Sequence, residues 1–404
     1  MEQLDSKELE TLLNTEMGVE DDVDGADDDL DTGSNASEQP FDADSIRIDQ
    51  QILSLKYVYE LYQDNVLKLN PDFQRRYVWG SRKKKSLLIE SLMLRIPIPA
   101  FYFFERNDGT FLVIDGQQRL HTIFDFLDGK FSLSGLEYLD KQCGGLKFDA
   151  LNAKYKTRIL RTQLAINILD ERSPGMVVFD IFRRVNTGGI SLNPQEMRNA
   201  ICSDKVRNYL KAGAQSEAFL TATRNKVKDL RLDDQELFLR FLTVYRRYDY
   251  QSRELKKLKP SKLTLLMDNE ISELDKLSKQ ELDCILAAYQ TSMSRCAAVF
   301  GKYAFVKVIL NRDNTIGINK DIINKSLLVG FSVLLADPNI DFDFALCDTT
   351  NTCAILAEAL KDSNYMNAIT KATGDERNIK ACLKYSLEVL QKCKIINLSS
   401  AKLS

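Results

Sequence analysis

One ten-residue stretch decides how the N-terminal part of this chain folds: Phe111-Leu112-Val113-Ile114-Asp115-Gly116-Gln117-Gln118-Arg119-Leu120. Its first four residues are apolar, which favours a buried strand. Residues 118–127 have helical spacing, and Gly129 provides a stop signal. Asp115 and Gly116 therefore form a sharp turn between an inner strand and the start of a helix. A helix start carries unpaired N–H groups and partial positive charge, so we predict that this turn binds an anion.

The side chains of this turn suit a phosphate group. Gly116 would let a phosphate approach the backbone closely, and Arg119 would add a bidentate charged contact. Gln117 and Gln118 offer uncharged amide donors. Asp115 repels a phosphate unless it holds a metal ion or a proton, which favours Mg²⁺ or acid–base chemistry. Spacing alone leaves a plainer alternative open, in which Asp115 and Gly116 are turn residues and Arg119 is a surface residue.

The flanking segments predict further elements of both kinds. The predicted strands cover residues 100–105, 110–114 and 164–169. The predicted helices cover residues 52–65, 81–95 and 174–185. Asn107-Asp108-Gly109 is a hairpin signal between two of the strands. Ser81 is the expected N-cap of the second helix, which stops before Pro97-Ile98-Pro99. These elements predict an α+β domain.

The C-terminal half is different in kind. Asn193-Pro194-Gln195-Glu196 begins a helix, with a cap residue, a proline at the first helical position and a glutamate three residues after the cap. After residue 201 nearly everything has helical periodicity, as in 236–248, 279–300, 322–335 and 352–360. We therefore predict an α+β N-terminal domain followed by an all-α region.

Charge is divided unevenly along the chain. Residues 1–45 hold sixteen acidic residues and one lysine, a net charge of −15, so the other 359 residues carry +12 against the −3 of the whole chain. We expect the acidic tail to be disordered, with mimicry of nucleic-acid charge as the alternative. A basic body suits a polyphosphate partner, although surface lysines that only maintain solubility would give the same balance.

Composition excludes several classes of protein. His121 is the only histidine, which removes His-based zinc hydrolases and the His-Asn-His nuclease fold. The eight cysteines form no C-x-x-C pair and are typical of reduced thiols, so we expect a cytoplasmic protein without a zinc site. We expect neither a signal peptide nor a membrane span, because the N-terminus is acidic and no apolar run approaches about 18 residues.

Basic residues gather in the helical half as well. Arg246, Arg247, Lys256 and Lys257 lie near Tyr248 and Tyr250, which suits contacts with a DNA backbone and base stacking. Acidic residues interrupt this run, so a solvated helix face is the alternative.

Four groups of residues now occur in one order along the chain. They are Asp72-Phe73-Gln74-Arg75-Arg76-Tyr77-Val78-Trp79, Pro97-Ile98-Pro99, Val113–Leu120 and Phe182-Arg183-Arg184-Val185-Asn186-Thr187-Gly188-Gly189, with Glu196 and Arg198 after them. Together they resemble the N-terminal domain of the GmrSD-type modification-dependent restriction enzymes, whose fold is similar to ParB and sulfiredoxin. The resemblance covers residues 46–205 well and the helical remainder loosely. With the charge and periodicity above, we predict an acidic tail over residues 1–45, this domain over 46–205 and a helical region over 206–404.

The resemblance implies a nucleotide-binding and NTP-hydrolysing domain that controls the cleavage of foreign, often modified, DNA in phage defence. Carried over by position, the implied catalytic residues are Asp115, Gln118 and Arg119, with Mg²⁺ held at Asp115 together with the nucleotide. The implied nucleotide-binding residues are Gln74, Arg75, Gly116, Gln117, Arg184 and Asn186.

Two departures from the family pattern matter. His121 stands where the family more often has threonine, and we expect it to pack or to face solvent. The His-Asn-His nuclease of many relatives is also missing, for want of histidines. Two alternatives to an NTPase therefore stay open: a regulatory module that binds nucleotide or DNA and acts through a partner nuclease, and a domain that nicks DNA itself. Homo-oligomerisation also stays open.

Overall fold

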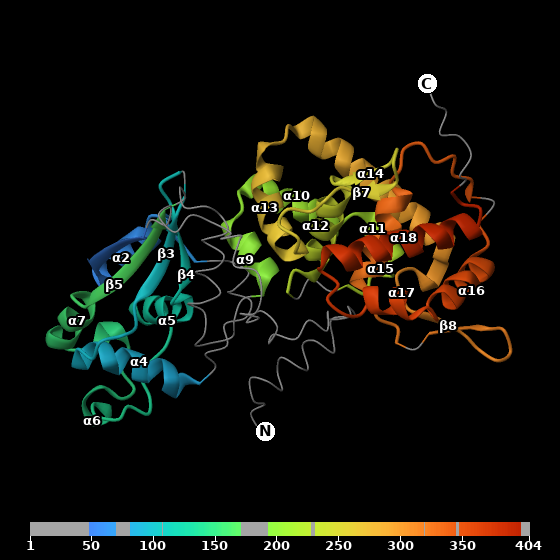
Figure 1. The fold of residues 1–404 in the computed structure, drawn as a ribbon. Helices are drawn as coiled ribbons and strands as arrows, with labels where there is room; N and C mark the ends of the chain where they lie inside the picture. Colours follow the sequence, from blue (N-terminus) through green and yellow to red (C-terminus); the bar gives the residue numbers. More distant parts are fainter. Residues whose placement is uncertain are drawn as a thin grey trace, which may run out of the picture. The chain divides into compact units, whose positions relative to one another are not determined.

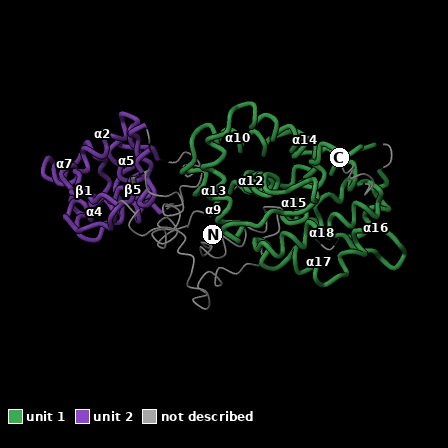
Figure 2. The backbone as a smooth tube through the Cα atoms, turned by 45° about the horizontal axis from the view of Figure 1, so that its top comes forward, with its two compact units in different colours: residues 1–37, 192–404 green, residues 38–191 purple. Residues whose placement is uncertain are grey.

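A computed structural model describes residues 48–69, 81–106, 108–170, 193–227, 231–318, 320–344 and 347–396. The chain divides into two compact units, with a boundary between residues 191 and 192 (Figure 2). The acidic tail and the expected helix at 174–185 lie outside the described residues.

The N-terminal unit is built on a five-stranded sheet with the order β1-β5-β3-β4-β2 (Figure 1). The strands are β1 (Ile48–Ser54), β2 (Leu67–Lys68), β3 (Phe101–Glu105), β4 (Phe111–Asp115) and β5 (Gln163–Asp170). The β1–β5 and β3–β4 pairs are antiparallel, and the β5–β3 and β4–β2 pairs are parallel. The predicted hairpin is confirmed: Arg106 N–H donates to the Thr110 carbonyl at 2.8 Å, and Gly109 has a φ of +73°.

Among the described residues of this unit, five helices accompany the sheet and share a single core with it. They are α2 (Leu55–Gln63), α4 (Arg82–Leu94), α5 (Gln117–Leu127), α6 (Asp140–Cys143) and α7 (Ala153–Leu160), with a short 3-10 turn at Phe148–Ala150. Phe103, Val113 and Ile166 alternate along their strands onto the face that contacts Leu120 and Ile123 of α5. This packing fixes the start of α5 against the end of β4.

The expected helix at 52–65 begins later than its spacing indicated. Residues up to Ser54 belong to β1, where Ile52 pairs with Ala165 of β5. Ser54 then caps α2, because its side-chain oxygen accepts the N–H of Tyr57 at 3.3 Å. Pairing with a distant strand overrides a local helical pattern here.

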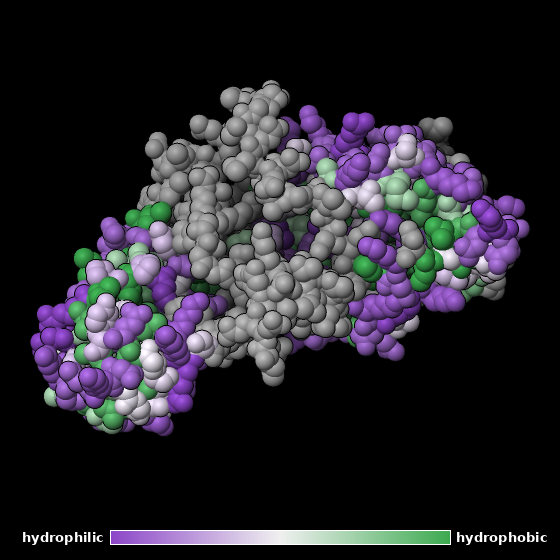
Figure 3. Space-filling view, turned by 90° about the horizontal axis from the view of Figure 1, so that it is seen from below, coloured by the Kyte–Doolittle hydropathy of each residue, from purple (hydrophilic) through white to green (hydrophobic). Residues whose placement is uncertain are grey.

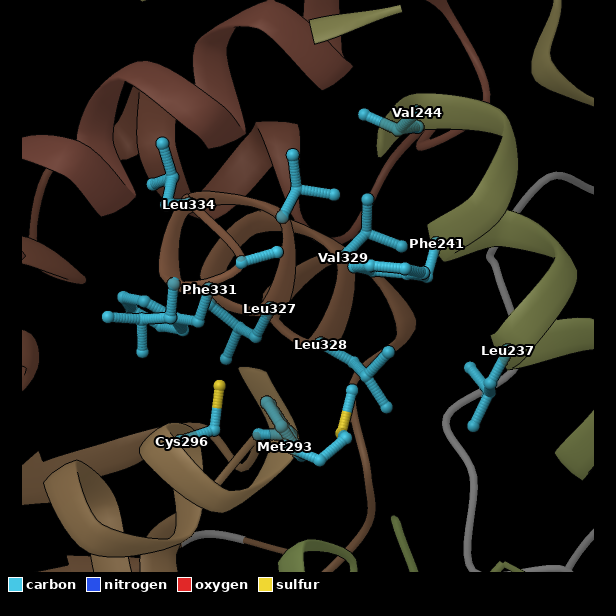
Figure 4. Close-up of a cluster of buried hydrophobic side chains, with 14 of the residues drawn as sticks. Leu237, Phe241, Val244, Met293, Cys296, Leu327, Leu328, Val329, Phe331 and Leu334 are labelled. Carbon is cyan, nitrogen blue, oxygen red and sulfur yellow. The ribbon is translucent and has the colours of Figure 1, made fainter. Parts of the chain in front are cut away.

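The C-terminal unit is mainly helical. Its helices are α9 (Pro194–Ile201), α10 (Asp204–Ala214), α11 (Glu217–Ala222), α12 (Asp233–Tyr245), α13 (Leu263–Lys276), α14 (Lys279–Phe300), α15 (Lys325–Leu335), α16 (Thr349–Ala359), α17 (Ser363–Ala368) and α18 (Glu376–Lys392). Every residue of α15 is buried, and its Leu327, Leu328 and Phe331 lie among side chains of α12 and α14 (Figure 4). The expectation of an all-α region needs a correction, because two short antiparallel ribbons are also present: β6 (Tyr248–Asp249) with β7 (Glu254–Leu255), and β8 (Val308–Leu310) with β9 (Ile316–Ile318).

Helix α9 lies in the helical unit, although we expected the domain boundary at residue 205. The predicted capping box is confirmed at its start, where Asn193 and Glu196 exchange hydrogen bonds. Arg198 on α9 donates from Nε to Asp268 on α13 at 2.7 Å, and both side chains are only 2% exposed. A buried charge is tolerated only beside its partner, so this ion pair ties α9 to the helical unit.

Among the described residues, no helix is both long and apolar enough to cross a lipid bilayer. On the face seen in Figure 3, the described surface carries hydrophilic residues with hydrophobic ones between them.

Candidate phosphate-binding site

The strand, turn and helix of the decisive stretch are present as predicted. Strand β4 ends at Asp115, Gly116 is the N-cap residue with a φ of +91°, and α5 begins at Gln117. No side chain caps α5 at its start. Positive φ at this position favours glycine, because a side chain would strain the backbone.

A β-bulge lies directly before the turn. Asp115 pairs with Tyr102, but Phe103 pairs with Val113, so β4 has one extra residue, Ile114. Bulges change the direction in which a strand presents its side chains and are frequent beside functional sites. The bulge therefore sets the direction of Asp115 at the edge of the sheet.

Gly116 has a different role from the one expected. A Cβ built at this position would lie 2.2 Å from Cδ1 and 2.7 Å from Cε1 of Phe101. The Phe101 ring thus occupies the space in which a side chain at this position would lie. Glycine is required here by its backbone conformation and by the aromatic ring packed against it.

The Arg119 side chain forms hydrogen bonds within the domain, whereas we expected it to be available for a phosphate. Its Nη1 donates to the carbonyl of Pro99, and its Nη2 donates to the carbonyl of Ala100 at 3.2 Å and to Oδ2 of Asp115 at 2.7 Å. The guanidinium also lies over the Phe101 ring, 4.5 Å from its centroid, and its side chain is 14% exposed. These contacts join the start of α5 to the chain entering β3. Burial lowers the pKa of Arg119, while the Asp115 carboxylate acts in the opposite direction.

Asp115 is the more accessible member of the pair. Its side chain is 26% exposed, and Arg119 contacts only Oδ2. Among the described residues, no hydrogen bond to Oδ1 is found. A carboxylate fixed through one oxygen, with its other oxygen at an uncapped helix start, can accept a proton or bind a cation.

The two glutamines differ in exposure. Gln117 is buried, whereas Gln118 is half-buried. Of the two, Gln118 is therefore the amide that a ligand would reach more easily. His121 lies one turn further along α5, with Nδ1 3.1 Å from Oδ2 of Asp125, consistent with the structural role expected for it.

The remaining residues of the expected nucleotide site lie outside the described residues: Gln74, Arg75, Arg184 and Asn186. Their roles stay predictions.

The basic cluster of the helical unit is less available to DNA than its sequence indicated. Arg246 and Arg247 both form ion pairs with Glu270, whose side chain is fully buried. Tyr248 is buried, and the hydroxyl of Tyr250 donates to the carbonyl of Val333 at 2.7 Å. The expectation that these tyrosines stack on bases is therefore wrong, because both rings pack into the helical core. Lys256 and Lys257 are exposed, and DNA binding by the cluster stays a prediction.

Sequence reasoning missed the part that Phe101 and the carbonyls of Pro99 and Ala100 play in this site. Pro97-Ile98-Pro99 was interpreted as a helix stop and as one of the family motifs, with no contact to the turn expected. The one available signal was its position directly before a strand, which places free carbonyls beside the neighbouring turn.

Residues 58–203 match the family model described as GmrSD restriction endonuclease, N-terminal domain. The match begins within α2 and ends after α9, so it includes the first helix of the helical unit. No curated protein and no solved structure matches the chain.

Proposed function

Because residues 58–203 form a GmrSD-type N-terminal domain, we propose that this protein binds and hydrolyses a nucleoside triphosphate and couples that reaction to the sensing of DNA. The family match indicates a component of a restriction or phage-defence system. The proposal includes nucleotide hydrolysis, DNA sensing and a fold similar to ParB and sulfiredoxin. A partner nuclease would perform the DNA cleavage.

The Asp115 carboxylate carries this proposal. It lies at the end of a buried strand beside an uncapped helix start, and only one of its oxygens is engaged by Arg119. The helix start favours the negative charge of phosphate oxygens. Arg119 then acts as a positioning residue, since its guanidinium holds Oδ2 and, among the described residues, no hydrogen bond to Oδ1 is found.

The residues present fit Mg²⁺ in one common mode. Within the described part of the chain, no group of three or more His, Cys, Asp or Glu side chains is placed to hold a metal ion. Mg²⁺ is commonly held by one or two carboxylates plus phosphate oxygens and water, so Asp115 is a sufficient protein ligand for a nucleotide complex. When bound, the ion would neutralise charge that develops on the phosphates during hydrolysis. Asp115 would bind the ion and so orient the phosphates. Gln118, at the first turn of α5, would contact the attacking water, and Arg119 holds the Asp115 carboxylate in place.

The test is Asp115→Asn in the full chain, assayed by phosphate release from each of the four NTPs with Mg²⁺, with and without DNA. The amide oxygen can still accept the Arg119 hydrogen bond, so the fold should be retained while the charge is lost. We expect turnover to fall at least 100-fold, in line with the loss of a group that stabilises transition-state charge. Asp125→Asn is the matched control: it removes a carboxylate on α5 that, like Asp115, is in an i,i+4 pair, and it should change turnover by less than about twofold.

The outcomes separate the candidate functions. Equal turnover in Asp115→Asn and the unmodified protein would refute this site. Nucleotide or DNA binding without any phosphate release supports the regulatory module. Nicking of plasmid DNA with Mg²⁺ or Mn²⁺ alone supports direct cleavage by the domain.

A further inference from the structure

A groove of about 430 Å³ opens on the N-terminal unit where β3 and β5 begin. One wall is the chain from Arg95 to Ile98, which follows α4, and the other is the end of α7 with the start of β5. The parallel pairing of β3 and β5 puts both strand starts at one edge of the sheet. Strand β4 is antiparallel to β3, so β4 ends with Asp115 at that same edge.

The groove is positively charged. Arg95, Arg158 and Arg161 line it, and none of its described lining residues is acidic. Helices α4 and α7 both end here, and each helix end contributes roughly half a negative charge, so the three guanidiniums leave an excess of about two positive charges. The sequence agrees, because residues 150–169 contain four basic residues and no acidic one.

Two features of the structure place these arginines where a ligand could contact them. Arg158 is held in place: its Nη1 donates to the Met93 carbonyl at 3.0 Å, and its guanidinium faces the Tyr155 ring at 5.9 Å. Arg95 ends α4 with a φ of +61°, a conformation in which glycine is the least strained residue. An arginine at this position keeps a cation at the rim of the groove. Arg95 and Arg161 are both exposed.

An apolar strip lies between the cations. Ile96, Pro97 and Ile98 line the groove, and Ile96 is 48% exposed. A surface that combines guanidiniums with apolar side chains suits a ligand with phosphates on one side and sugars or bases on the other.

From this combination we propose that the groove binds the phosphodiester backbone of a nucleic-acid strand. Mg²⁺ bound with an NTP is commonly held by one or two carboxylates, and none of the groove's described lining residues is acidic. A phosphodiester carries one charge per phosphate and needs no metal, which matches guanidinium donors. The groove gives the proposed DNA sensing a binding site and rests on that part of the proposed function, but it does not require nucleotide hydrolysis. It places a nucleic-acid site on the same sheet edge as Asp115.

The test measures binding of a fluorescent oligothymidylate, and of a duplex with the same length, to the full chain over a series of salt concentrations. The probe should be about 20 nucleotides long, since single-strand sites cover roughly 4–16 nucleotides. The variant is Arg95→Ala with Arg161→Ala, which leaves Arg158 and its structural hydrogen bond intact. The control is Lys141→Ala with Lys147→Ala, two exposed cations of the same unit outside the groove.

We expect the arginine variant to bind the strand roughly tenfold more weakly for each arginine removed. The slope of log K against log salt should also fall by about one to two units. The lysine variant should bind within about twofold of the unmodified protein. The single-stranded and duplex probes show which form of nucleic acid occupies the groove.

Three results would overturn the proposal: unchanged binding in the arginine variant, an equal loss in the lysine variant, or loss of NTP binding with strand binding intact. The last would make the groove a mononucleotide site. Phosphate release without DNA, measured alongside, should be unchanged in the arginine variant, which separates this test from that of Asp115.

Discussion

Gly116→Ala should destabilise the N-terminal unit, and the cost has two parts that can be measured separately. The first part is conformational, because φ is +91° at this position and an L side chain there costs about 1–2 kcal/mol. The second is steric, because the new Cβ would lie 2.2 Å from Cδ1 of Phe101. Overpacking of this kind costs about 1–3 kcal/mol. The sum is about 2–5 kcal/mol.

Gly109→Ala is the matched control. Its φ of +73° imposes a similar conformational cost, but a Cβ there would meet nothing within 4 Å. Only the first part, about 1–2 kcal/mol, should appear. A third variant, Gly116→Ala combined with Phe101→Ala, removes the ring, so adding the methyl group in that background should cost no more than Gly109→Ala.

The assay is hydrogen exchange of peptides from residues 101–127 across a urea series, which follows this unit within the full chain. With a denaturant dependence of about 2 kcal/mol per molar urea, the midpoint should fall by about 1–2.5 M for Gly116→Ala and about 0.5–1 M for Gly109→Ala. Equal shifts for the two glycines would contradict the packing of Phe101 against Gly116, and with it the account of Arg119.

Two further predictions concern buried charge and pH. Arg198→Ala should reduce the stability of the helical unit by about 3–5 kcal/mol, because it removes the guanidinium that pairs with the buried Asp268 carboxylate. Arg198→Met with Asp268→Leu removes both charges and should cost far less. Urea unfolding followed by circular dichroism compares the two variants, and equal losses would contradict the role of the ion pair. Burial and the hydrogen bond to Asp128 raise the pKa of Tyr59 to about 12. Because the folded-state pKa lies above the unfolded value of about 10, this stabilisation is complete below about pH 10 and is lost between about pH 10 and 12. Tyr59→Phe should remove that part of the pH dependence of the urea midpoint, and an unchanged profile would refute it.

Local sequence determined the hairpin, the strand-turn-helix and the capped start of α9. The Asp108–Gly109 turn, the apolar residues before Asp115 and the Asn193–Glu196 capping box each act over a few neighbouring residues. Turn chemistry, periodicity and caps of this kind depend on short stretches of chain, so one sequence suffices to find them.

Tertiary structure alone decided the rest. Helical spacing at Ile52 gave way to pairing with β5, more than a hundred residues away along the chain. Arg119 has the right position for a phosphate, yet the carbonyls of Pro99 and Ala100 and the Phe101 ring take up its guanidinium. Sequence spacing determines the helix face from which a side chain projects. Its partners come from distant segments, which only the folded chain brings within hydrogen-bonding distance. The groove lined by Arg95, Arg158 and Arg161 also depends on the folded chain, because its cations come from segments about sixty residues apart.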